Sequence, residues 1–410
     1  MHICNIVQIC IILFNNYLDM DRIEKTTKAK IATQAIFLVC GLGISSWAPM
    51  VPYAKERLQL NDANLGVLLL FLGAGAISMM PISGILSDKF GSRKVILWAA
   101  LLMAMVLPSL LLMDSPIWMG VMLFIFGSAV GTVDVAMNAH GVQVQNLHGK
   151  PIMSSLHGLF SVGGLFGSLG LGFLMKIGLQ PVVASIIIAV LLIVIVIWKY
   201  SDLFDRDTER AAIHEFSSQE QNGKSASYTW LTGSVLFLGV MCFIVFLSEG
   251  AMLDWSAVFL RESRSVEEEF TGIGYAAFSV AMAAMRLIGD KLVARLDGRK
   301  VVVAGSMIAA TGLFIVLLTP WVFTALLGFV LLGLGAANIV PVFISEGGRL
   351  KDVSASVAIP AITTIGYAGQ LAGPALLGFI AEQYSLTIAL GCIGVLLASV
   401  ALLYARRKVI

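Results

Sequence analysis

Residues 84–94 read Gly84-Ile85-Leu86-Ser87-Asp88-Lys89-Phe90-Gly91-Ser92-Arg93-Lys94 and lie between two long apolar segments. Gly91 allows a tight reversal between two helices, because glycine adopts backbone conformations that other residues avoid. A shorter copy, Gly298-Arg299-Lys300, follows about 206 residues later, again between two apolar segments. We therefore expect the chain to reverse direction at matching points in two related halves.

Glycines outside this loop repeat at the same interval. Five of them have a counterpart 206 residues further on: Gly66, Gly127, Gly163, Gly167 and Gly172 match Gly272, Gly333, Gly369, Gly373 and Gly378. Self-similarity at a fixed offset indicates a duplicated structural unit. In a hydrophobic chain of this length it is typical of parallel repeats around a central membrane pathway, as in many secondary transporters.

Composition places the chain in a membrane. Of its 410 residues 58% are hydrophobic and 13% charged, and the mean hydropathy is +0.90; soluble domains carry roughly 25% charged residues. Apolar runs of about 20 residues match the hydrocarbon thickness, which predicts helices rather than the short alternating strands of a barrel. Twelve such segments are expected, at residues 31–52, 63–86, 95–113, 117–144, 154–175, 181–199, 230–254, 271–292, 300–318, 322–345, 356–380 and 385–405.

Several other classes of protein are disfavoured. A net charge of +2 gives no reason to expect a nucleic-acid partner, and the five scattered cysteines form no metal-binding cluster. The chain has no G-x-x-x-x-G-K-[ST] nucleotide motif and no catalytic constellation. We expect a monomer in the lipid bilayer that is not an enzyme and has no cofactor or metal.

Lysine and arginine predict the topology. Twenty-one of the 27 fall in the tails and loops of one side, and only Lys55, Arg57, Lys176, Arg261 and Arg264 fall on the other. Because positive charge marks the cytoplasmic side, we expect a multi-pass protein of the inner (plasma) membrane with both termini in the cytoplasm. The expected organisation is a cytoplasmic segment 1–30 with Met20 as the true start, an N-terminal bundle 31–200, a cytoplasmic linker 201–228, a C-terminal bundle 229–405 and a tail 406–410.

The loop at residues 84–94 resembles the signature cytoplasmic loop of the major facilitator superfamily, G-x-L-(S/A)-D-(R/K)-x-G-(R/K)-(R/K). With twelve spans and a long middle loop, the resemblance covers the whole chain. It implies an all-α membrane protein of two six-helix bundles related by a pseudo-twofold axis. Three stretches (133–138, 248–255 and 286–290) look like the fucose–proton symporter-like branch and its uncharacterised YbjJ-like bacterial members.

The same resemblance assigns a gate. It implies that an acid and bases of the loop pair when the cytoplasmic side is closed; the alternative is a basic loop with a helix stop. Alignment of Gly298 with Gly91 places Arg295 opposite Asp88, so the acid of the second copy is expected at Asp290, four residues after Arg286. The expected gating residues are Gly84, Asp88, Gly91, Arg93, Lys94, Arg286 and Asp290.

Charged residues within spans are costly and usually face a cavity or a partner. Asp134 has Asn138 four residues on, on the same helix face, and Val340 stands 206 residues later, so the repeat does not require an acid here. The resemblance to fucose symporters implies proton coupling at Asp134. The alternatives are a carboxylate satisfied by Thr132 or a neighbouring helix, or one that binds sugar hydroxyls directly.

Further polar residues could bind the solute. Glu249 is deep in the seventh span, whereas Asp254, beside Trp255, could instead belong to an interfacial belt. The complete set of candidates for solute binding and proton coupling is Asp134, Asn138, Glu249, Asp254, Gln34, Trp47, Asn338 and Gln370. Where fucose symporters have an acid in the first span, this chain has Ser45-Ser46-Trp47, a departure from the fucose-type coupling scheme.

The repeated pairs Gly163/Gly167 and Gly369/Gly373 have GxxxG spacing, which lets helices approach closely. We interpret them as the interface where the two halves slide; static packing is the alternative. The leading hypothesis for function is a secondary active transporter that moves a small polar solute, such as a sugar, by alternating access and proton symport. The alternatives are a multidrug or metabolite exporter, which the 18 methionines favour, and a transporter-like sensor, for which the linker is too short.

Overall fold

The long apolar segments all form helices in the computed structural model, which describes residues 2–149, 152–217, 232–347, 349–350, 353 and 355–407. Their bounds are α1 His2–Ser45, α2 Met50–Arg57, α3 Asp62–Phe90, α4 Ser92–Ser109, α5 Pro116–His148, α6 Met153–Lys176, α7 Pro181–Tyr200, α8 Arg206–Ser217, α9 Gly233–Arg264, η1 Glu268–Phe270, α10 Ile273–Leu296, α11 Gly298–Leu318, α12 Val322–Ala336, α13 Ile339–Gly347, α14 Ala355–Gln383 and α15 Leu386–Arg406.

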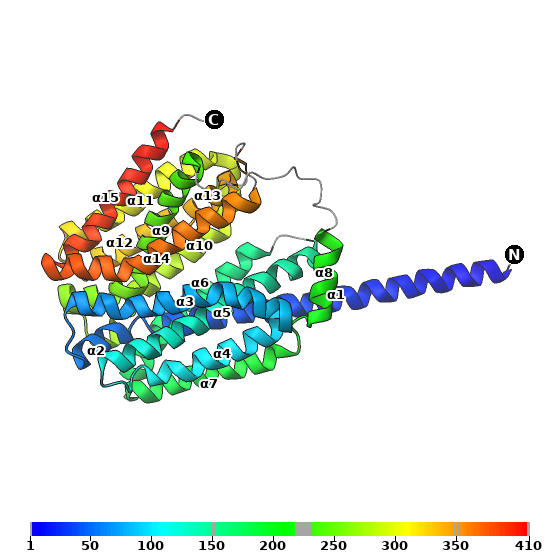
Figure 1. Ribbon diagram of the computed structural model, residues 1–410, viewed down its shortest axis with the longest axis horizontal. Helices are drawn as coiled ribbons and strands as arrows, with labels where there is room; N and C mark the ends of the chain where they lie inside the picture. The colour runs from blue at the N-terminus through cyan, green and yellow to red at the C-terminus, as the bar shows by residue number, and fades with distance from the viewer. Residues whose placement is uncertain are drawn as a thin grey trace.

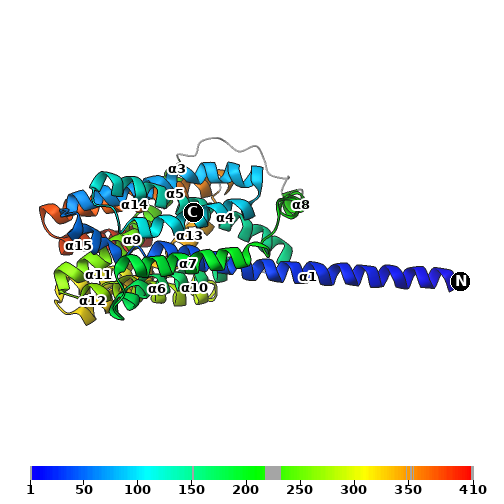
Figure 2. The same ribbon diagram turned by 90° about the horizontal axis from the view of Figure 1, so that it is seen from below.

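These helices form two bundles that lie side by side (Figure 1). Helices α1 to α7 make the N-terminal bundle, α9 to α15 make the C-terminal bundle, and the short α8 lies across one end. Within the described residues, twelve helical segments are long and apolar enough to cross a membrane. The prediction of an all-α protein with twelve membrane spans in two six-helix bundles is therefore confirmed. We call the end where α8 lies the linker end, and the opposite end, where α3 begins, the far end (Figure 2).

Two of the spans are interrupted, which the apolar pattern did not predict. The first span turns between Ser45 and Met50, and Pro49 lies in this turn. Proline disfavours a continuous helix here because it lacks an N–H and restricts the conformation of the residue before it. The tenth span breaks between Ala336 and Ile339, and Asn338 occupies the break. Because only a few residues interrupt an otherwise apolar run, hydropathy reads each span as continuous.

Repeated glycines mark helix contacts that the two bundles share. A side chain at Gly127 would overlap the carbonyl of Leu72, and one at Gly333 would overlap the carbonyl of Phe278. Both the glycines and their partners are 206 residues apart. The same close approach therefore joins α3 to α5 in one bundle and α10 to α12 in the other.

The GxxxG pairs do not form the interface between the bundles, so that prediction is wrong. Gly163 and Gly167 pack against the backbone of α1, and Gly369 packs against the backbone of α9, each within its own bundle. The bundles meet instead through other repeated glycines. Gly66 packs against the backbone of α14 at Pro374 and Gly378, and its counterpart Gly272 packs against the carbonyl of Ser168 in α6. A stripe of small residues indicates that another helix packs closely against it, but it does not identify which helix that is.

Charged groups also join the bundles at the far end. The Lys55 ammonium donates to Asp62 Oδ1 of its own bundle and to Glu262 Oε1 of the other, both at 2.5 Å. Arg261 Nε donates to Glu56 Oε1 at 2.9 Å across the same boundary. We call Lys55, Glu262, Arg261 and Glu56 the far-end latch; sequence reasoning treated Lys55 and Arg261 only as topology markers.

Glu382 also joins the two bundles at the far end. Glu382, at the end of α14, accepts a hydrogen bond from the backbone N–H of Asp62 at 3.0 Å and from Asn61 Nδ2 at 3.2 Å. Asp62 is the first residue of α3, so the carboxylate sits at a helix N-terminus, where unpaired N–H groups and the helix dipole favour negative charge. The far end is therefore held by polar contacts as well as by glycine packing.

Candidate functional site

A cavity of about 500 Å³ lies between the two bundles, with walls from both. Six of the eight residues that the sequence named for solute binding and coupling line it: Asp134, Asn138, Glu249, Asp254, Asn338 and Gln370. They come from α5, α9, α14 and the break between α12 and α13. Residues that are far apart in the chain thus meet in one chamber of a size typical for small-molecule sites.

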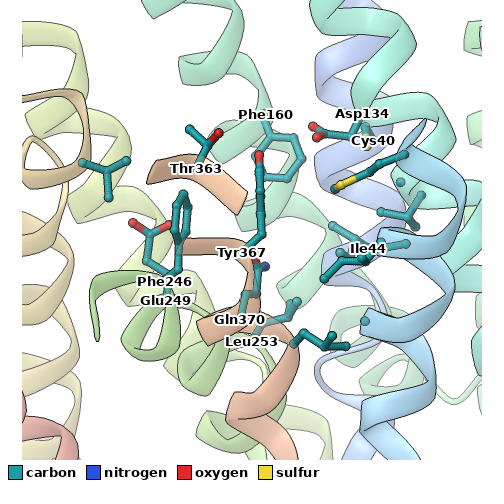
Figure 3. A pocket seen from close by; sticks show the side chains of 18 of the residues that line it. Cys40, Ile44, Asp134, Phe160, Phe246, Glu249, Leu253, Thr363, Tyr367 and Gln370 are labelled. Carbon is teal, nitrogen blue, oxygen red and sulfur yellow. The ribbon is translucent and has the colours of Figure 1, made fainter. Parts of the chain in front are cut away.

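Asp134 lies on the wall that α5 contributes (Figure 3). Asn138, one turn further along the helix, donates from Nδ2 to Asp134 Oδ1 at 3.2 Å and to the Asp134 carbonyl at 2.8 Å. Thr132, the alternative local partner, donates instead to the Ser128 carbonyl at 2.7 Å. Among the described residues the Asp134 carboxylate has an amide partner and no ion pair, so its negative charge is not neutralised by the protein.

Glu249 and Arg286 face each other on the C-terminal wall. Arg286 Nη2 lies 3.5 Å from Glu249 Oε2, and both side chains are about one-fifth exposed, at 22% and 17%. The other oxygen, Glu249 Oε1, is buried and has no hydrogen-bond partner in the described part of the chain. The sequence placed Arg286 in a gate at the linker end, but Arg286 lines the cavity. The expected pairing with Asp290 lies outside the described residues, because only the backbone of Asp290 is described.

The structure places Asp254 and Asn338, two candidates whose surroundings could not be predicted from the sequence. Asp254 is 7% exposed and lines the cavity, so it is not part of an interfacial belt. Asn338, at the break in the tenth span, donates from Nδ2 to the Met285 carbonyl at 3.3 Å. Gly289 of α10 makes room for this amide, since a Cβ there would overlap Asn338 Oδ1. A broken helix thus brings a polar side chain to the cavity wall.

Aromatic rings stand between the two charged walls. Tyr367 of α14 stacks on Phe246 of α9, with ring centroids 5.1 Å apart and planes inclined by 17°. Figure 3 shows Tyr367 between Asp134 on one side and Glu249 on the other, with Phe160 beside it. Sequence reasoning missed Phe160 and Phe246, because an aromatic residue in a span can face lipid, core or cavity with no difference in pattern.

Two named candidates lie elsewhere, which corrects the sequence expectation. Trp47 is fully buried in the turn between α1 and α2, and Gln34 is partly buried in α1; neither lines the cavity. Trp47 falls in the turn that ends the first helix, so its direction is set by that break. A periodicity argument for a continuous helix could not have placed it.

The loop at residues 84–94 lies at the linker end. The Asp88 carboxylate has no ion-pair partner among the described residues, and the Arg93 guanidinium lies over the Tyr200 ring, 4.1 Å from its centroid. Gly84 is exposed, with open space where a side chain would be, and Lys94 is also exposed. The predicted pairing concerns a state in which this end is closed, so it stays a prediction.

Helix α8 docks against the same loop. Gly91 has a φ of +85°, and a Cβ there would come within 2.9 Å of Arg206 Cβ. The buried carboxylate of Glu209 accepts a hydrogen bond from the Ser92 backbone N–H at 2.9 Å, at the N-terminus of α4. Arg210 Nη2 donates to the Asp88 carbonyl at 3.3 Å. The middle linker therefore contacts the loop that was expected to gate the transporter.

The second copy of the loop corrects the alignment of the halves. Asp297 has a φ of +70° and a ψ of 141°, close to the 85° and 142° of Gly91, and the two residues are 206 apart. Asp297 rather than Gly298 is thus the counterpart of Gly91, and Ala294 rather than Arg295 stands opposite Asp88. Arg299 then matches Arg93, and it donates to the Ala405 carbonyl at the end of its own bundle.

Two six-helix bundles that enclose a central cavity, with charged and polar side chains set in an otherwise apolar wall, define a membrane transport protein. The Major Facilitator Superfamily model matches residues 33–350, and the chain belongs to this family. An uncharacterised MFS-type transporter of Yersinia pestis is 42% identical over 372 residues, which cover 91% of this chain and 94% of that protein. The membrane protein MosC of Rhizobium meliloti is 33% identical over 393 residues, or 94% and 92% of the two chains.

Solved structures share the fold. The nucleoside transporter NupG superimposes with a TM-score of 0.67 at 18% identity, over 94% of this chain and all of that one. A bacterial homologue of the human lysosomal transporter Spinster, in an inward-facing and occupied conformation, gives a TM-score of 0.69 at 14% identity, over 92% and 96% of the chains. At these identities the likeness shows the architecture and not the substrate.

Proposed function

We propose that this chain is a secondary active transporter that carries a small polar solute through the central cavity and couples its movement to protons. The observation that carries the proposal is the Asp134 carboxylate, which lines an inter-bundle cavity and has the Asn138 amide, but no counter-charge, as a partner in the described part of the chain. A charge in a span without a counter-charge is strongly disfavoured. Proton uptake removes the charge of Asp134. A state in which the cavity is closed to water is therefore more stable when Asp134 is protonated than when it is charged.

The contacts between the bundles support alternating access around this cavity. The far-end latch and the Glu382 contacts join the two bundles at one end, whereas Asp88 and Arg93 of the linker-end loop make no ion pair with the other bundle in the described structure. We place both termini and the linker on the cytoplasmic side of the inner membrane, with the chain acting as a monomer. In that orientation the structure represents the state closed to the outside.

Opening of the far end requires the latch to separate while the linker end closes. The pseudosymmetric glycine contacts, Gly66 with α14 and Gly272 with α6, lie on the two sides of this interface. Such small-residue contacts permit close approach without interlocking side chains. They suit a surface where one bundle rocks against the other, with Asp88 and Arg93 available to form the closed linker-end gate.

Proteoliposome uptake with an imposed pH gradient tests the coupling. Gradient-driven accumulation of at least one member of a panel of small polar solutes is expected, and Asp134→Asn should abolish accumulation while leaving downhill exchange intact. Asp114→Asn, in an exposed turn at the far end, is the matched control. Unimpaired accumulation by Asp134→Asn would remove the coupling role from this residue, and the absence of flux for every solute would contradict transport itself.

Export of apolar metabolites or drugs is the second candidate. Its supporting observation is the apolar share of the cavity wall, which includes Met80, Met153, Phe160 and Phe246. Met and aromatic side chains adapt to varied apolar ligands. Energy-dependent release of a hydrophobic dye from vesicles would favour this candidate, whereas the buried carboxylates and amides favour a polar solute.

A further inference from the structure

The described side chains that line the cavity include more acidic than basic groups. Three carboxyl groups, those of Asp134, Glu249 and Asp254, share the cavity with one guanidinium, that of Arg286, and one imidazole, that of His157. Arg286 is already committed to Glu249, with 3.5 Å between Nη2 and Oε2. Asp254 has no hydrogen-bond or ion-pair partner among the described residues. The excess of carboxyl groups therefore favours a cationic over an anionic solute, and the low-dielectric walls strengthen this preference.

Asp134 has a hydrogen-bonding amide beside it but no counter-charge among the described residues. Its contact with Asn138 Nδ2 is 3.2 Å long, and the same amide group also donates to the Asp134 carbonyl at 2.8 Å. No lysine or arginine of the N-terminal bundle lines the cavity within the described residues; its one basic group there is the His157 imidazole of α6. A buried charge without a partner is unfavourable, and a cation brought by the solute would be its natural partner.

The aromatic residues beside Asp134 point to the same ligand chemistry. Tyr367, backed by Phe246 in a stack of 5.1 Å, and Phe160 lie between the two walls (Figure 3). The face of an aromatic ring attracts an ammonium group within about 6 Å of its centroid. A carboxylate together with aromatic faces is the combination that binds protonated amines in proteins. The surrounding amides of Asn338 and Gln370 supply donors and acceptors for hydroxyl groups.

We propose that the transported solute is a small cation that carries a protonated amine, bound by Asp134 beside the Tyr367 ring. This inference rests on the proposed transport function and adds the substrate class. Asp134 then holds a proton when the cavity is empty and the ammonium group when the solute is bound. The uncharged part of the solute lies against Phe160 and the amides of the C-terminal wall.

The test uses the full chain in proteoliposomes and in detergent, with matched solutes that differ at one group. Two such sets are glucosamine, glucose and glucuronate, and phenylethylamine, phenylethanol and phenylpropionate. We expect an amine member to raise the melting temperature and to be transported. Its apparent affinity should be at least about tenfold higher than that of its neutral or carboxylate analogue. Stronger binding or transport of the neutral or carboxylate members would overturn the inference while transport itself stands; no flux for any member would contradict the proposed function and the inference together.

Variants distinguish the binding group from a structural one. Asp134→Asn should remove the preference for the amine over its neutral analogue, whereas Asp114→Asn should keep it. Because Asp134→Asn could also impair folding, a second pair is needed: Tyr367→Phe keeps the ring and the preference, and Tyr367→Leu lowers it several-fold. Retention of the full amine preference by a folded Asp134→Asn protein, or equal preference in the two Tyr367 variants, would refute the proposed binding mode.

Discussion

Removal of the Lys55 ammonium should separate the two bundles at the far end. In Lys55→Met the side chain keeps most of its apolar length and loses its charge. Asp62 Oδ1 and Glu262 Oε1, each 2.5 Å from the ammonium, are then left as two carboxylates without the cation between them. Because Asp62 belongs to one bundle and Glu262 to the other, their repulsion acts directly on the interface.

The exposure of the three side chains determines how much free energy the loss of the ammonium group costs. Lys55 is 11% exposed, Asp62 16% and Glu262 39%. Exposed ion pairs contribute at most about 1 kcal/mol, and removal of one partner from a fully buried pair costs about 3–5 kcal/mol. A value of about 2 kcal/mol is intermediate, and it corresponds to roughly a 30-fold shift in the equilibrium between the joined and separated far ends.

Spin labels at two related turns can measure this shift. Asp114→Cys and Pro320→Cys place labels at exposed positions between α4 and α5 and between α11 and α12, in a background with the native cysteines replaced. Double electron–electron resonance in nanodiscs should show a larger population of long distances in Lys55→Met. The ratio of long to short distances should rise by about 30-fold.

Arg261→Gln is the matched control. Arg261 and Glu56 also bridge the bundles but are 34% and 53% exposed, so solvent screens their interaction. A shift of about fivefold or less is expected for this variant. An unchanged distance distribution in Lys55→Met, or one equal to that of Arg261→Gln, would refute the reasoning from burial.

Two further predictions concern the linker and the packing. Burial raises the pKa of the Glu209 carboxyl, against the opposing effect of the hydrogen bond from the Ser92 N–H, so docked α8 holds a proton more tightly than undocked α8. Docking should therefore weaken as the pH rises through the raised pKa. Hydrogen exchange of α8, corrected for intrinsic rates, should be faster at about pH 8 than at about pH 5, and a pH dependence that persists in Glu209→Gln would exclude this carboxyl as its source. Gly127→Ala should lower the free energy of unfolding by about 1–3 kcal/mol, because the added Cβ overlaps the Leu72 carbonyl. Gly170→Ala, where a Cβ would meet open space, should leave it unchanged in a thermal unfolding assay. Equal effects of the two substitutions would contradict the packing argument.

The sequence determined the membrane class, the duplicated architecture and part of the site. Twelve apolar segments predict helices because the hydrocarbon region requires every backbone group to be paired within the segment. Asp134 and Asn138 were placed on one helix face by their spacing of four residues, and their hydrogen bond follows from that spacing alone. These features depend on local periodicity and solvation, which are readable along the chain.

Only the tertiary structure decided which surfaces meet. It pairs Arg286 with Glu249 of another helix, turns Trp47 away from the cavity and puts Asp297 where the first copy has Gly91. It also directs the GxxxG glycines to packing within each bundle and gives the interface to Gly66 and Gly272. Spacing along one helix fixes the face a residue lies on, but the helix that covers that face depends on the packing of all twelve spans, which no local pattern contains.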